Sequence, residues 1–192
     1  MSLFTRIENP NPDAIKGLIA DGIILADEKL GELYSPSHDI FEDIALIRYV
    51  EQIYQGNSEV FEFFAKLDGK EPAIRRAFRL WLNDQLYDAS STFSDFISSV
   101  LGDLKIDQYW KDETIISILS SNYSKNYFDS NIDVLKVNDW ALLVRFVHLL
   151  RTSCQEPDEQ LAQQLKDDNK KGNSYWLYLK PVGPGWKTMV DF

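Results

Sequence analysis

The stretch PAIRRAFRLWLNDQLY, residues 72–87, carries the clearest helical pattern in the chain. Its apolar side chains recur at the spacing i, i+3, i+4, i+7 and i+8, which places them on one face of an α-helix. These side chains are Ile74, Ala77, Phe78, Trp81 and Leu82. Proline is favoured in the first turn of a helix, so Pro72 indicates where this helix begins. The stretch therefore predicts an amphipathic helix packed on a core.

Similar signals on both sides of this stretch predict a mainly helical protein. Apolar periodicity, capping residues and terminating glycines favour further helices over these ranges: 12–22, 36–55, 58–68, 91–102, 112–122, 138–153 and 157–171. The helix over 138–153 carries apolar residues on most of its surface, so we expect it to be central, with Trp140, Val144 and Val147 buried. Residues 122–133 are polar and rich in turn formers, and predict a long loop.

Two segments have the alternating pattern of β-strands. Within residues 22–35 the triplets IIL and ELY can pair as a small hairpin. The tail SYWLYLKPVGPGWKTMVDF, residues 174–192, alternates on both sides of PVGPG and predicts a C-terminal β-hairpin. The fold class expected is therefore mainly α (α+β). It is a single globular domain over residues 1–192, with about seven to eight helices and the hairpin 174–192 as part of it.

The net charge of −10 is concentrated in the first third of the chain. Residues 1–60 hold 11 acidic side chains against 4 basic ones. Such a surface repels polyanions, so we expect no nucleic-acid partner, whereas a basic protein would be attracted. Simple solubility is the alternative explanation. The N-terminus has no secretory signal, and Arg145 and His148 interrupt the longest apolar run, so we expect a cytoplasmic protein without a membrane partner.

The residues that carry common chemistries are scarce. The single cysteine, Cys154, lies at the end of a predicted helix where the dipole opposes a thiolate, and the two histidines form no ligand motif. Phosphate loops, nucleophile elbows and calcium loops are absent from the sequence. We therefore expect no catalytic residue, no metal and no cofactor.

Three arginines, Arg75, Arg76 and Arg79, cluster on the helix over 72–87 in an otherwise acidic protein. Guanidinium groups bind carboxylates and phosphates through paired hydrogen bonds, so the cluster is a candidate anion or partner site. The alternative is an ion-pair network with the chain's own acids.

The aromatic tail supplies a second set of candidates. Trp176 and Tyr178 would share one face of the first strand, and Trp186 and Lys187 would follow the bend. An exposed face with Trp and Tyr is typical of an interface, whereas a covered one only closes the core.

Composition and the missing motifs favour a non-enzymatic acidic module of the inhibitor, immunity or adaptor type, which binds a protein partner. Two alternatives stay open. One is an enzyme or small-ligand protein with an anion site near Arg75 and Arg79, and the other is a structural component that self-associates. The sequence leaves the oligomeric state open.

Overall fold

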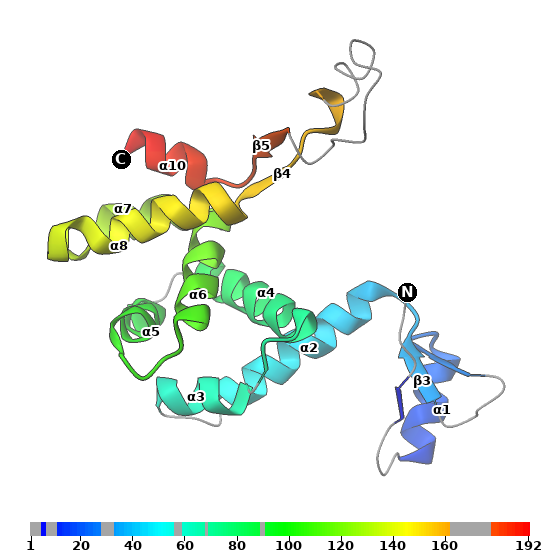
Figure 1. The fold of residues 1–192 in the computed structure, drawn as a ribbon. Coiled ribbons are helices and arrows are strands. Elements are labelled where there is room, and N and C mark those ends of the chain that lie inside the picture. The colour runs from blue at the N-terminus through cyan, green and yellow to red at the C-terminus, as the bar shows by residue number, and fades with distance from the viewer. Residues whose placement is uncertain are drawn as a thin grey trace.

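The computed structural model describes residues 5–6, 11–27, 33–55, 59–67, 69–88, 91–161 and 178–192. The fold is mainly helical with two small antiparallel sheets, which confirms the predicted class (Figure 1). The body is built from α2 (Asp39–Gln55), α3 (Val60–Leu67), α4 (Pro72–Asp88), α5 (Ser91–Gly102), α6 (Gln108–Ser120), α7 (Ser124–Ser130) and α8 (Ile132–Ser153). In the ranges described, no helix is both long and apolar enough to cross a membrane.

Aromatic rings fill the core between α3, α4 and α5. The indole ring of Trp81 lies 5.4 Å from the ring of Phe63 and 5.8 Å from that of Phe96, centroid to centroid. Its N–H donates to Glu51 Oε2 of α2 at 2.5 Å, so the buried indole is not left unsatisfied. Trp81 and Phe78 are both fully buried, which confirms the apolar face predicted for residues 72–87.

The most buried helix is α6, where every residue from Glu113 to Leu119 is buried. It contacts α4, α5, α7 and α8. Thr114 and Ser117 can lie in the interior because their hydroxyls donate to backbone carbonyls one turn earlier, each at 2.9 Å. The sequence predicted instead that the helix over 138–153 would be the central one.

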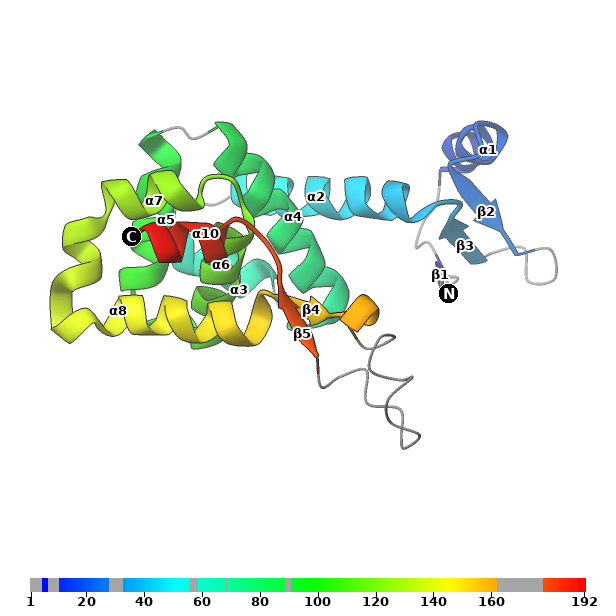
Figure 2. The ribbon, with the colours of Figure 1, turned by 90° about the horizontal axis from the view of Figure 1, so that it is seen from above.

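Helix α8 instead lies along the edge of the body and is sharply bent (Figure 2). Asn138, Asp139 and Trp140 have φ values of 53°, 53° and 66°, a left-handed conformation that costs L-residues roughly 1–2 kcal/mol each. After this bend the helix buries Phe146, Leu149 and Leu150, whereas Val144 is exposed. The prediction of a central helix is therefore wrong: Trp140 is 42% exposed.

The predicted loop over residues 122–133 is also wrong, because Ser124–Ser130 forms the short helix α7. Tyr127 stacks on Phe146 at 5.6 Å between centroids, and Phe128 meets the same ring edge-on at 5.1 Å. Both rings are buried. Burial against α8 thus overrides the local preference of a polar sequence for turns.

The described residues before α2, which are 5–6, 11–27 and 33–36, form a small α/β unit at the far end of α2 (Figures 1 and 2). Its sheet has the order β1-β3-β2, from β1 (Thr5–Arg6), β2 (Ile24–Ala26) and β3 (Leu33–Pro36). The pairing of β2 with β3 confirms the predicted small hairpin. Helix α1 (Pro12–Ala20) begins at Asn11, whose Oδ1 accepts from the backbone N–H groups of Asp13 and Ala14.

The C-terminal β element exists, but its second predicted strand is wrong. Strand β5 (Leu179–Pro181) pairs with β4 (Gln155–Pro157), which follows α8. Residues Gly185–Asp191, expected to return as a strand, form the helix α10. The alternation of WKTMV is too short to separate a strand from a helix, and α10 gains burial against α6 and α7. The first part of the predicted hairpin, residues 174–177, lies outside the described residues.

Candidate functional site

The predicted arginine cluster lies on α4, where two of its three members pair with acids of the same chain. Arg76 Nη2 lies 2.7 Å from Asp43 Oδ2 on α2. Arg79 Nε donates to Glu113 Oε2 on α6, and the side chain of Glu113 is only 6% exposed. Arg75 is exposed and has no ion pair within the ranges described. Arg76 and Arg79 therefore follow the ion-pair alternative and hold α2, α4 and α6 together.

Tyr109, at the start of α6, lies beside this cluster. Burial raises its pKa, as does the charge of Glu113, while the charges of Arg75, Arg79 and Lys70 lower it in part. Lys70 Nζ lies 5.2 Å from the centre of the Tyr109 ring and 2.5 Å from Asp107 Oδ2. Most of the cationic charge around Tyr109 is thus already neutralised, which leaves Arg75 as the cation available to an external anion.

Trp186 points inward and anchors α10. Its indole N–H donates to the backbone carbonyl of Cys154 at 2.7 Å, and the half-buried ring packs on the core. Burial raises the pKa of the Cys154 thiol, and a hydrogen bond with Ser120 and the charge of Arg79 offset this only in part. A buried thiol with a raised pKa is a poor nucleophile, so the end of α8 serves as a packing site.

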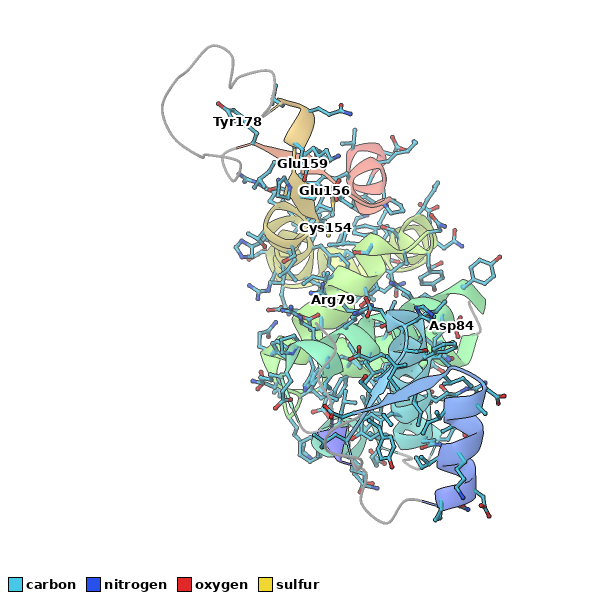
Figure 3. The ribbon with its side chains drawn as sticks, turned by 90° about the vertical axis from the view of Figure 1, so that its right-hand side faces the viewer. Arg79, Asp84, Cys154, Glu156, Glu159 and Tyr178 are labelled. Carbon is cyan, nitrogen blue, oxygen red and sulfur yellow. The ribbon has the colours of Figure 1, made fainter. Side chains whose placement is uncertain are left out.

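Tyr178 and Lys187, two further candidates of the tail, do not form one site with the arginines of α4. Figure 3 shows Tyr178 at the end of the molecule that carries the β4–β5 sheet, away from Arg79. Tyr178 is half-buried, and its backbone carbonyl accepts from the N–H of Asp158 at 2.7 Å. Lys187 is exposed and pairs with Asp191 one turn later on α10. Trp176 lies outside the described residues.

The most distinctive surface belongs to what we call the N-terminal arm, residues 11–27 together with 33–44. Figure 2 shows this part extending from the helical body along α2. Helix α1 contains no buried residue at all. Five large apolar side chains of the arm are exposed: Leu18, Ile19, Leu25, Ile40 and Ile44.

Acidic residues lie close in sequence to most of these apolar ones. Asp13 and Asp21 flank the apolar residues of α1, while Asp39 and Glu42 lie beside Ile40 at the start of α2. None of these four carboxylates forms an ion pair with another residue that the structure describes. The arm therefore combines apolar area with uncompensated negative charge. Its acidity could be read from the sequence, but the exposure of its apolar residues could not.

A second exposed apolar surface lies on α8, after its bend. Val144 is 62% exposed and Val147 36% exposed, and Trp140, in the bend before them, is exposed as well. The sequence had assigned these residues to the core, since periodicity alone does not tell a covered apolar face from an open one.

No family model matches this sequence, and no curated protein is significantly similar to it. The function must therefore be argued from the geometry.

Proposed function

We propose that the protein is a non-enzymatic module that binds a protein partner through the N-terminal arm, in the manner of an inhibitor, immunity protein or adaptor. The observation that carries the proposal is the set of five exposed apolar side chains on the arm. Several exposed apolar side chains on one segment, with charged residues among them, are typical of a protein interface rather than of a solvated surface.

The apolar face of α2 supports the proposal, because part of this face is exposed. Ile40, Ile44, Ile47 and Val50 follow one another on this face. Val50 is fully buried and Ile47 packs on the core, whereas Ile44 is 51% exposed and Ile40 62% exposed. The same face is thus buried near the end of α2 and exposed near its start. A partner could cover the exposed part, as the core covers the rest.

The charge of the arm indicates what kind of partner it suits. The unpaired carboxylates of Asp13, Asp21, Asp39 and Glu42 favour a basic protein surface. Charge complementarity of this kind speeds association and weakens as salt increases, because exposed charges are screened.

The double variant Ile40→Ser/Ile44→Ser tests the apolar part of the proposal. Full burial of an isoleucine side chain stabilises a complex by about 1.5–3 kcal/mol, and just over half of each side chain is free to be buried. We expect a loss of about 2 kcal/mol, or about 30-fold in Kd. The partner is captured from source extract on the immobilised protein, purified, and measured by calorimetry with wild type and variant.

Leu104→Ser is the matched control, since Leu104 is 95% exposed in a turn far along the chain from the arm. The control should bind like wild type, and Asp39→Asn/Glu42→Gln should bind more weakly at low salt only. A captured partner with equal affinity for wild type and the Ile40→Ser/Ile44→Ser variant would refute the arm as the binding surface.

A further inference from the structure

A cavity lies between α5, α6 and the bend of α8, in a part of the molecule remote from the N-terminal arm. Its volume is about 620 Å³, within the range of roughly 300–1,000 Å³ that small-molecule sites occupy. Apolar side chains form most of its wall: Leu101, Ile115, Val134, Val137, Ala141 and Leu142.

The bend of α8 creates the cavity. The left-handed residues Asn138, Asp139 and Trp140 turn the chain, so Val134 and Val137 reach the cavity from one side and Ala141 from the other (Figure 2 shows the turn). Val134 is 53% exposed and Val137 57% exposed, although both lie beside the buried Ile115. Left-handed backbone at non-glycine residues is costly and gathers at functional sites, where the surrounding structure maintains it.

Of the two cationic side chains that line the cavity, Arg145 has a partner among the described residues and Lys111 does not. Arg145 donates to Asp112 through Nε at 2.8 Å and also through Nη2, and Gln108 donates to the same carboxylate at 2.9 Å. Asp112 is therefore neutralised by Arg145. Lys111, four residues before Ile115 on the same face of α6, lines the cavity, and its ammonium group has no hydrogen bond or ion pair within the described part of the chain.

We propose that this cavity binds a small organic monocarboxylate. The apolar body of the ligand lies against Ile115, Leu101 and Leu142, and its carboxylate pairs with the ammonium group of Lys111. An apolar wall with few, well-placed polar groups is the usual composition of a small-molecule site. A single uncompensated cation in such a wall selects an anion over a neutral molecule of the same shape.

Calorimetry of the full chain with two carboxylates tests the proposal and separates two ligand shapes. Decanoate, used below its micellar concentration, probes a straight chain, and 2-naphthoate probes an aromatic body; the methyl ester of each is the neutral comparison. We expect at least one acid to bind about tenfold more tightly than its ester. Wild type that binds neither acid, or binds acid and ester equally, would overturn the proposal.

Three variants locate the binding. Lys111→Met keeps the length of the side chain and should weaken acid binding about tenfold while leaving ester binding unchanged. Ala141→Phe should fill the cavity and abolish both. Lys136→Met, on the exposed side of α8 and outside the cavity lining, is the matched control and should bind like wild type. If Lys136→Met weakens binding as much as Lys111→Met, the carboxylate is held by general surface charge and the site is wrong. Circular dichroism of each variant confirms that the fold is retained.

Discussion

Replacing Gly185 by alanine would test the most unexpected contact of the fold, the docking of α10 on α6. Gly185 is buried at the first position of α10. A Cβ added there would lie 2.6 Å from the backbone oxygen of Leu119 and 2.9 Å from its Cδ2 atom. Carbon and oxygen atoms in contact lie about 3.3 Å apart, so α10 or α6 would have to move by about 0.7 Å.

The clash is with backbone, so rotation of a flexible side chain cannot relieve it. Overpacking of this kind costs about 1–3 kcal/mol. For a chain of this length, each kcal/mol lowers Tm by about 2–4 °C, so we expect a decrease of about 2–12 °C, or about 4–8 °C for a cost of about 2 kcal/mol. If α10 separates from the body instead of moving, Trp186 also loses its hydrogen bond with Cys154 and becomes exposed.

Thermal and urea unfolding followed by circular dichroism measure the effect, and tryptophan emission reports on Trp186. Gly102→Ala is the matched control, because Gly102 ends α5 with nothing within 4 Å of a built Cβ. It should leave stability unchanged or raise it by up to about 1 kcal/mol. Gly185→Ala with the stability of wild type would refute the docking of α10. That outcome would instead suit the hairpin that the sequence predicts, where residue 185 lies in a connecting loop.

Two further predictions concern buried polar groups. Arg79→Met leaves the buried carboxylate of Glu113 without its partner, and we expect the free energy of unfolding, measured in urea, to fall by about 2–3 kcal/mol. The decrease is smaller than for a fully buried pair because Arg79 is 34% exposed. Arg79→Met/Glu113→Leu should recover most of that loss, and a double variant as unstable as the single one would contradict the role of Glu113. Burial raises the pKa of Tyr127 and also that of Cys154. The unfolded chain releases the thiol proton above about pH 8.5 and the phenol proton above about pH 10, whereas the folded state still keeps both protons there. Stability should therefore fall as pH rises through this range, and Tyr127→Phe should reduce the slope above about pH 10; an unchanged slope would show that Tyr127 does not contribute.

Local sequence pattern identified some of the candidate site residues, but packing decided which of them have partners. The charge of the N-terminal third was evident from composition, and the arginines of α4 were evident as a cluster. Whether Arg76 and Arg79 were free depended on Asp43 and Glu113, which lie 33 and 34 residues away in sequence. Sequence patterns do not reveal such partners. The cavity between α5, α6 and the bend of α8 could not be predicted from the sequence, because a helix-forming sequence does not show where its backbone becomes left-handed.

The sequence by itself determined the elements whose signals are local and unopposed. The apolar face of residues 72–87, the cap at Asn11 and the pairing of β2 with β3 were all readable, because periodicity, capping and turn residues act over a few positions. Tertiary structure decided which apolar faces were covered. Helix α6 is central, and Thr114 and Ser117 can be buried there because their hydroxyls donate to backbone carbonyls within the helix. Val144 on α8 and Ile40 on α2 are exposed. Burial depends on neighbours that are distant in sequence, and only the folded chain brings them together.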